Sequence, residues 1–347
     1  MVKSTFQSDE DQQMRQIVAQ EAKVSRLAIL SDAEVQQDTS SAVLSVRRLL
    51  ENLDKPIIRL VDQAAVHAKT LEDNRYLEVL RWLSVVPFVR HHERYSESRL
   101  PGSGKWLLEN PQYLGWKNSS HSSILLLHGI MGSGKTSLAS AVVDSFLTES
   151  FNQTSAAPMA YFYCAKNASE LERADPDEIM RSLVRQLTFP TSTQQNVNDA
   201  VLTEYERREA GAKIDGFDKL GLRIEECIKL ILDITGSNPA AIVIDALDEV
   251  QEERRHALVD AFKSITRESG SVVKVFITSR DNSNVLALLA DASKIRIHDG
   301  DNRADMELFV RHHVSLAIRS CRLLDGNVSS DLQEDLVQAL LAGSGEM

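Results

Sequence analysis

The sequence predicts an α/β fold with a five-stranded, mainly parallel sheet flanked by helices and preceded by an α-helical N-terminal region. Up to about residue 86 the apolar residues recur at three- and four-residue steps, which is typical of amphipathic helices. After residue 123 short apolar runs alternate with helical patterns, as in strands joined by crossover helices. We therefore expect a helical region at 1–86, a connector at 87–123, an α/β domain at 124–300 and the start of a further helical region at 301–347.

Composition excludes several classes of protein. The chain has 347 residues, 43% of them hydrophobic, and a net charge of −11, so we expect a folded protein that repels nucleic acid. Its three cysteines lie far apart without CxxC spacing, which indicates neither a disulfide framework nor a zinc site. No signal peptide and no apolar run of about 18 residues is visible. These features predict a cytoplasmic protein without a membrane span.

The expected elements follow from the apolar patterns. A helical pattern runs over 9–84 with three or four helices, and glycine, proline and serine then mark the connector, in which a turn precedes a short helix at Trp106–Glu109. Strands are expected at Ile124–Leu127, Ala160–Cys164, Ala241–Ile244, Val272–Thr278 and Ile295–Ile297. Helices are expected at Thr136–Thr148, Asp177–Phe189, Leu220–Ile234, Arg254–Ser269, Asn282–Leu289, Asp305–Ile318 and Asp331–Leu341.

The strongest motif is Gly129-Ile-Met-Gly-Ser-Gly-Lys-Thr136, which fits GxxxxGK[ST] directly between the first expected strand and its helix. Glycines allow the backbone to wrap a polyphosphate, the lysine supplies charge at the β- and γ-phosphates, and the threonine hydroxyl binds Mg²⁺. The alternative is a plain glycine-rich turn. A similar stretch at 102–105 fails the pattern, because Arg99 stands where the first glycine should be and Trp106 where Ser or Thr should follow. The expected nucleotide-binding residues are Gly129, Gly132, Ser133, Gly134, Lys135, Thr136 and Ser137.

A second motif is an apolar strand that ends in acids, Ala240-Ala-Ile-Val-Ile-Asp-Ala-Leu-Asp-Glu249. It looks like a Walker B segment, in which Asp245 at the strand end holds Mg²⁺ through its water shell. Asp248 and Glu249 lie where a carboxylate orients and deprotonates an attacking water. The alternative is a solvated helix start, and the sequence leaves open which of the two acids acts.

A third motif is Lys274-Val-Phe-Ile-Thr-Ser-Arg280, a buried strand that ends in polar residues. Because a strand intervenes between the first two motifs, we expect the strand order 5-1-4-3-2. That order places Thr278, Ser279 and Arg280 beside the γ-phosphate, where a guanidinium forms bidentate hydrogen bonds. The alternative is a surface arginine that caps the strand end.

Other polar residues give weaker signals. The pairs His91-His92 and His312-His313 are neighbours in sequence, so their side chains point in different directions and a shared metal is not expected. Cys164 is expected to be a small core residue rather than a nucleophile. The run Glu204–Glu209 is expected to be a solvated helix face.

Together these motifs resemble the NACHT branch of the STAND signalling NTPases, in the nephrocystin-like form found in fungal NOD-like receptors with ankyrin or WD repeats. The small residue Ala246 followed by Asp248-Glu249 is similar to that branch and unlike the paired aspartates of plant NB-ARC proteins. The segments at 81–92 and 102–108 and Trp116 look like the lead into the phosphate loop of the fungal proteins. The resemblance covers roughly residues 75–345.

The resemblance implies a switch: ADP holds a closed form, ATP opens it, and open chains oligomerise to bring their N-terminal effectors together. Relatives continue into a winged-helix region and sensor repeats, so we expect a truncated receptor that releases ADP fast. We also expect an exposed apolar patch near Val337, Leu340 and Leu341, which favours self-association.

We therefore expect a protein that binds ATP or ADP with Mg²⁺ and slowly hydrolyses the triphosphate. GTP is not excluded, because no base-reading motif is visible. The expected partners are nucleotide, other copies of the chain and unknown proteins that contact the N-terminal helices. The alternatives are a steady-turnover ATPase or kinase, and a scaffold that binds nucleotide without hydrolysis. An arginine-rich lid insert, typical of kinases, is not visible.

Overall fold

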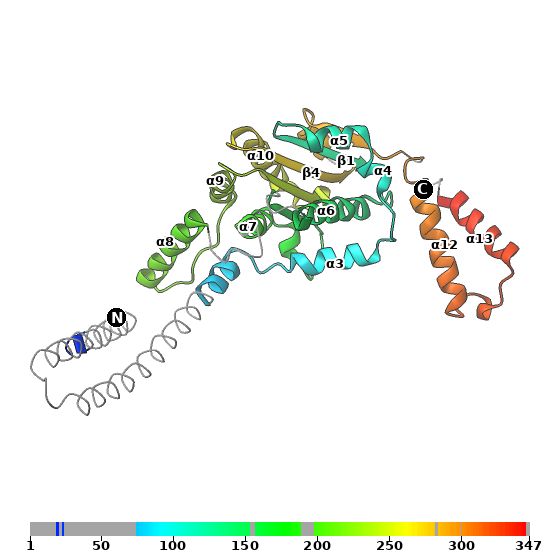
Figure 1. The fold of residues 1–347 in the computed structure, drawn as a ribbon, viewed down its shortest axis with the longest axis horizontal. Coiled ribbons are helices and arrows are strands. Elements are labelled where there is room, and N and C mark those ends of the chain that lie inside the picture. The colour runs from blue at the N-terminus through cyan, green and yellow to red at the C-terminus, as the bar shows by residue number, and fades with distance from the viewer. Residues whose placement is uncertain are drawn as a thin grey trace, which may run out of the picture. The chain divides into compact units, whose positions relative to one another are not determined.

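The computed structural model describes residues 19, 20, 23, 74–152, 157–188, 198–281, 284–298 and 300–344. Apart from residues 19, 20 and 23, which are helical, the helices expected between residues 9 and 73 lie outside the described residues. The last part of that expected pattern is a helix at 74–83. From Tyr76 onward the chain forms one compact unit, which contains the sheet and the helices around it (Figure 1).

Five parallel strands form one sheet in the order β2-β3-β4-β1-β5, which confirms the predicted order. Strands buried on both faces read as continuous apolar runs, and this is why the sequence located β1 to β4. The fifth strand, expected at 295–297, is a short edge strand at 293–296 with exposed residues. Their bounds are β1 (Ser123–Gly129), β2 (Met159–Tyr163), β3 (Ala240–Asp245), β4 (Val273–Arg280) and β5 (Ser293–Arg296).

The helices alternate with these strands along the chain (Figure 1). Several begin with a side-chain cap: Asp175 accepts from the backbone N–H of Asp177, and proline follows the cap at the first helical position. The helices are α3 (Phe88–Ser98), α4 (Lys105–Leu108), α5 (Pro111–Asn118), α6 (Lys135–Asn152), α7 (Pro176–Leu187), α8 (Asp199–Asp215), α9 (Ile224–Ile234), α10 (Glu252–Glu268), α11 (Val285–Leu288), α12 (Arg303–Arg319) and α13 (Ser330–Ser344).

The core consists of two apolar layers, one on each face of the sheet. Successive strand residues point to opposite faces, so Leu126 and Ile244 belong to one layer whereas Leu127 and Val243 belong to the other. The first layer is completed by α7, α9, α10 and the helix at 74–83, and the second by α4, α5 and α6. Asp245 and Arg280, the last residues of β3 and β4, belong to neither layer.

The stretch at 87–123, which we expected to be a connector, contains three helices that pack on the α/β unit. Leu107, Tyr113 and Trp116 are buried in the same apolar layer as α6. Asp144 of α6 accepts a hydrogen bond from Ser96 Oγ at 2.8 Å, contacts His92 Nε2 at 3.0 Å and pairs with Arg99, all from α3 or its end. These polar contacts, together with the rings of Phe88 and Tyr95 that pack against the same apolar layer, hold α3 in place.

The two last helices form a hairpin that contacts the rest of the unit near the start of α12. Asn302 Nδ2 donates to the carbonyl of Ser133 at 3.1 Å, and the backbone N–H of Gly104 donates to Asp305 at 2.7 Å. Val337 is fully buried, so it does not belong to the exposed patch that we expected, whereas the neighbouring Leu340 is 53% exposed.

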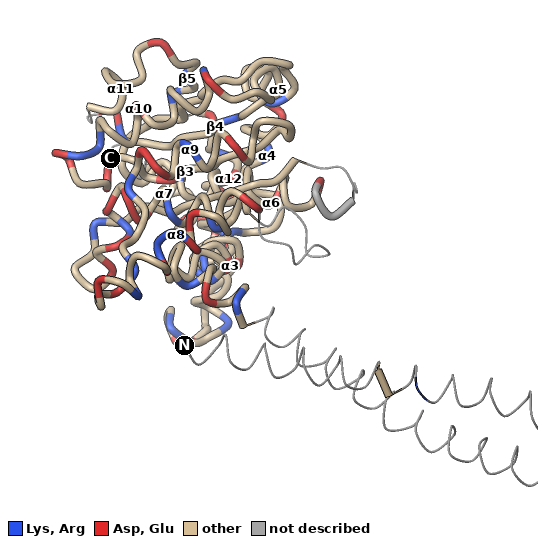
Figure 2. Tube along the Cα trace, turned by 90° about the vertical axis from the view of Figure 1, so that its left-hand side faces the viewer, with Lys and Arg blue, Asp and Glu red and all other residues tan. Residues whose placement is uncertain are grey.

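Charged residues of both signs alternate over the described elements (Figure 2). Many of them form ion pairs between elements, such as Arg254 with Asp175 and Asp177, and Arg311 with Glu334. Among the described residues, no helix has both the length and the apolar character needed to cross a membrane.

Candidate functional site

The loop between β1 and α6 has the backbone geometry that the glycine motif predicts. Gly132 and Gly134 both have φ of 82°, in the left-handed region that residues with a Cβ rarely adopt. At Gly129 a Cβ would lie 2.9 Å from Ser133 Oγ and 3.1 Å from Ile297 Cβ, so a side chain does not fit there. The loop conformation therefore depends on glycine at these three positions.

Lys135, the first residue of α6, folds its side chain back over this loop. Its ammonium donates to the carbonyls of Gly129 at 2.9 Å and Ile130 at 2.6 Å. Burial lowers the pKa of Lys135, whereas the carboxylates of Asp248 and Asp245 raise it. The side chain thus holds one charge inside the loop, at the N-terminus of a long helix, where an anion is favoured.

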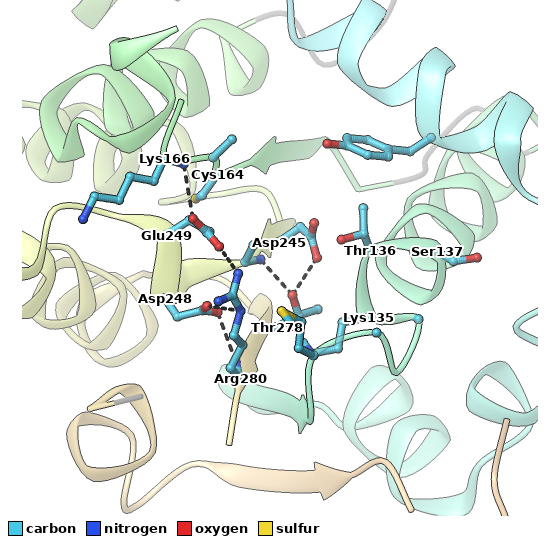
Figure 3. A pocket seen from close by; sticks show the side chains of 16 residues that line it. Lys135, Thr136, Ser137, Cys164, Lys166, Asp245, Asp248, Glu249, Thr278 and Arg280 are labelled. Atoms are coloured by element: carbon cyan, nitrogen blue, oxygen red, sulfur yellow. Dashed lines mark hydrogen bonds and ion pairs between the residues drawn. The ribbon is translucent and has the colours of Figure 1, made fainter. Parts of the chain in front are cut away.

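Asp245 lies at the end of β3 and is 2% exposed. Thr278 Oγ1 donates to its Oδ1 at 2.6 Å and accepts from the backbone N–H of Ala246 at 2.8 Å. The side chains of Thr136 and Asp245 point toward one another in Figure 3. Burial is the main influence on Asp245 and raises its pKa, whereas the nearby hydroxyls of Thr278 and Thr136 lower it.

Asp245 and Thr136 fit a magnesium ion. A carboxylate and a hydroxyl are hard oxygen ligands, and Mg²⁺ in nucleotide sites usually takes one or two protein ligands and completes its shell with water and phosphate. Within the described residues, no group of three or more His, Cys, Asp or Glu could hold a metal ion. The ion is therefore expected to bind together with a phosphate rather than alone.

Asp248 and Glu249 follow β3 on a 3₁₀ turn, η2 (Leu247–Glu249), and both contact Arg280 from the end of β4 (Figure 3). Asp248 Oδ1 accepts from the backbone N–H of Arg280 at 3.0 Å, and its Oδ2 lies 3.1 Å from Nε. Glu249 pairs with the terminal nitrogen of the same guanidinium. One arginine thus bridges both candidate bases.

The sheet explains why these distant segments meet. Because β4 lies between β3 and β1, Arg280 is in register with Gly129 on one side, and Ile277 is in register with Ile244 on the other. Parallel strands place their carboxyl ends at one edge, where ligands of open α/β sheets bind. The phosphate loop, Asp245 and Arg280 consequently face one cleft.

That cleft has a volume of about 530 Å³ and is lined by most of the predicted site residues. Gly129 and Ser133 are not part of its lining, whereas Tyr95, Ala165 and Lys166 line it and were not predicted. Tyr95 belongs to the stretch interpreted as a connector, so no sequence signal marked it. The predicted residues that line the cleft are Gly132, Gly134, Lys135, Thr136, Ser137, Asp245, Asp248, Glu249, Thr278 and Arg280.

Cys164, His91 and His92, which gave weaker signals in the sequence, lie in different surroundings. Cys164 lines the cleft but is buried, and burial raises the pKa of its thiol well above the ordinary value, which disfavours a reactive thiolate. His92 is a packing residue between Tyr163 Oη at 2.8 Å and Asp144. His91 contacts Glu170, so the two neighbouring histidines do have separate partners.

A second groove of about 690 Å³ lies on the other side of the phosphate loop. It shares Gly132, Gly134 and Ser137 with the first cleft, and its far wall is α12. On that wall the rings of Phe309 and His313 contact one another with centroids 4.2 Å apart. The loop thus separates a polar cleft from a groove that presents aromatic rings.

Replacing Asp245 with asparagine is expected to stabilise the nucleotide-free protein at pH 7 by an amount on the order of 1 kcal/mol, while magnesium-dependent nucleotide binding is lost. A carboxyl with a raised pKa is more easily protonated in the folded than in the unfolded state. Its destabilising effect therefore grows as the pH rises above the ordinary value of 3.8 through the raised pKa.

Thermal unfolding of both proteins between pH 4 and pH 7 measures this effect. The difference in midpoint is expected to shrink toward pH 4, because a lower pH favours the neutral form of the carboxyl in the folded state. A lower midpoint for Asp245→Asn at pH 7 would contradict the assignment of burial as the dominant influence on this group.

Comparison with known proteins agrees with this geometry. The model of the family described as Nephrocystin 3, N-terminal matches residues 102–280, which contain the loop, the acids and Arg280. Vegetative incompatibility protein HET-E-1 of Podospora anserina is 26% identical over 211 residues, which are 59% of this chain. The chain spans about 14% of the length of that relative.

Solved structures of replication proteins are also similar. The Aeropyrum pernix ORC1 protein in complex with DNA has a TM-score of 0.38 at 14% identity, with 71% of this chain and 60% of that chain covered. Domain III of the Thermotoga maritima replication initiation protein DnaA has a TM-score of 0.34 at 10% identity, with 70% of this chain and 80% of that chain covered.

Proposed function

This chain belongs to the nephrocystin 3 N-terminal family of NACHT-type P-loop NTPases, and from that premise we propose that it is a nucleotide-operated signalling switch. In this proposal the described unit binds ATP or ADP with Mg²⁺ and hydrolyses ATP slowly. The bound nucleotide then controls self-association and, through it, the N-terminal region at 1–86.

The observation that carries the proposal is the convergence of three sequence-distant motifs on one cleft. Lys135 and the start of α6 supply positive charge for the phosphates, and Thr136 with Asp245 supplies the magnesium ligands. Asp248, Glu249 and Arg280 lie across the cleft from them. Bound Mg²⁺ would neutralise charge on the β- and γ-phosphates.

The nucleoside half of the ligand is proposed to lie in the groove beyond the loop. The two hollows share Gly132, Gly134 and Ser137, so a ligand whose phosphates lie against the loop can extend into the groove. Phe309 and His313 offer ring faces on which a base stacks. This arrangement suits either purine, so ATP and GTP remain alternatives for the test below.

Slow hydrolysis, rather than steady turnover, is supported by the contacts of the two acids. A general base must accept a proton from water, and both candidate bases are paired with Arg280. A γ-phosphate would compete for the same guanidinium, because Arg binds phosphate as it binds carboxylate. Turnover then requires Arg280 to leave the carboxylates and bind the γ-phosphate. The two acids are thus released to accept a proton only when the third phosphate is present.

Two measurements on the purified protein test the proposal. Denaturation and chromatography identify the released nucleotide by base and phosphate count, and a single-turnover assay gives the hydrolysis rate. A switch is expected to retain its product and to turn over slowly. Rapid multiple turnover would indicate a metabolic ATPase, phosphate transfer to an added acceptor would indicate a kinase, and binding without hydrolysis would indicate a scaffold.

Replacing Arg280 with glutamine is expected to weaken ATP binding about 10-fold and to change ADP binding by less than about 2-fold. The reason is that only ATP offers the γ-phosphate to the guanidinium. Calorimetric titration with each nucleotide measures the two affinities. The control is Arg296→Gln, because Arg296 is exposed on β5 and pairs with Asp281 outside the cleft. Equal losses for ATP and ADP in Arg280→Gln would refute the γ-phosphate role.

A further inference from the structure

Arg255 is a buried arginine in the first part of α10 that the proposed site does not use. It is 7% exposed, and it is the residue next to Arg254, whose guanidinium lies at the surface in ion pairs with Asp175 and Asp177. A buried cation is costly unless hydrogen bonds replace its water shell. The hydrogen-bond partners of Arg255 therefore indicate its role in the structure.

Those partners lie on two segments that carry the candidate catalytic groups. Nη2 of Arg255 donates to the backbone carbonyl of Asp248 at 2.6 Å and to that of Val250 at 2.8 Å. Nη1 donates to Oδ1 of Asn284, which follows β4, at 2.6 Å. One planar guanidinium thus contacts the turn that holds both acids and the segment just past Arg280.

The turn needs such support because its backbone is strained. Ala246, the residue before η2, has φ of 53°, in the left-handed region where a residue with a Cβ is disfavoured. The turn itself has few backbone bonds: the N–H of Glu249 donates to Ala246 at 2.9 Å, and that of Val250 donates to Leu247 at 3.2 Å. Arg255 donates hydrogen bonds to the carbonyls of Asp248 and Val250, the residues on either side of Glu249.

We propose that Arg255 is a positioning residue for hydrolysis, which fixes the backbone of η2 so that Asp248 and Glu249 point at the γ-phosphate position and at Arg280. The inference rests on the proposed function, because it assigns these acids to the hydrolytic step. Arg255 itself does not line the cleft. Its loss therefore affects the rate of hydrolysis and leaves the affinity for nucleotide nearly unchanged.

The test compares Arg255→Met, Arg255→Lys and the matched control Arg254→Met in the full chain. Hydrogen exchange of the nucleotide-free proteins reports the turn directly, and single-turnover hydrolysis with a separate ATP titration reports the chemistry. We expect Arg255→Met to speed exchange at 247–250 with 129–136 unchanged, and to slow hydrolysis about 10- to 100-fold with affinity within about 2-fold. Arg255→Lys should show a smaller loss, and Arg254→Met should resemble the wild type.

Each result decides the question. Unchanged exchange at 247–250 overturns the inference, and so does faster exchange with a wild-type rate of hydrolysis. If Arg255→Met does not fold, Arg255→Lys decides by the same two readouts. If the wild type binds ATP but does not hydrolyse it, the proposed hydrolysis fails, whereas the exchange data still show whether Arg255 holds the turn.

Discussion

Lys135→Ala is expected to lower the affinity for Mg·ATP by about 100-fold or more while the fold is retained. The mutation removes the full charge that lies inside the phosphate loop, where its ammonium already contacts the carbonyls of Gly129 and Ile130. Nothing in the apolar layers depends on this side chain, so unfolding should be little affected. Calorimetric titration measures the affinity, and circular dichroism checks the fold.

Lys105→Ala is the matched control for this experiment. Lys105 ends a second Gly-Ser-Gly-Lys sequence, but it is exposed and does not line the cleft. Its replacement should leave the affinity unchanged. An unchanged affinity in Lys135→Ala would refute the site, and an equal loss in both variants would point to a general effect of charge.

Glu249→Gln and Asp248→Asn are expected to bind Mg·ATP normally and to hydrolyse it about 100-fold more slowly, because an amide does not accept the proton of the attacking water. The larger effect is expected for Glu249, whose side chain is 25% exposed against 8% for Asp248. Asp248 is also held by the backbone N–H of Arg280 at 3.0 Å, which suits a supporting role.

Single-turnover hydrolysis at saturating ATP measures the effect, and Glu253→Gln serves as control because Glu253 is an exposed acid on the first turn of α10. That control should retain the wild-type rate. If neither Glu249→Gln nor Asp248→Asn slows hydrolysis, neither acid is the base, and the chemistry must be assigned to another group of the cleft.

The strands and the phosphate loop could be predicted from sequence because their physical requirements leave plain marks. A strand buried on both faces needs an uninterrupted apolar run, and a loop that wraps phosphate needs glycine at fixed spacing. The placement of Arg280 near the loop followed from the order of the motifs along the chain. These inferences use local composition and one topological rule.

Helix α3 could not be predicted in this way, because its most buried side chain is polar. In α3 the buried anchor is His92, between Tyr163 and Asp144, and a histidine gives no apolar period. For α8 the sequence indicated only a solvated helix face at Glu204–Glu209, where Glu204 pairs with Arg207 and Arg208 at i,i+3 and i,i+4. The contacts of α3, in contrast, depend on partners that are distant in sequence.

Arg255 illustrates the same limit within the site. In the sequence it is one of two adjacent arginines, and nothing in their composition distinguishes them. Their directions on α10 differ by about 100°, so one guanidinium lies at the surface and the other under η2. Which of the two arginines is buried depends on how α10 is rotated about its axis relative to the sheet. Sequence periodicity defines that rotation only within a residue or so.

The short strand β5 has a consequence for how copies of this chain can associate. It lies at one edge of the sheet, with Ser293 and Arg296 exposed and Lys294 partly exposed. An open edge strand is a template for another strand, and lysine and arginine on such an edge oppose pairing because each added copy would bring like charges together and bury them. Amyloid-like sheet extension is therefore disfavoured at β5, so further copies of the chain are not expected to add to the sheet at this edge.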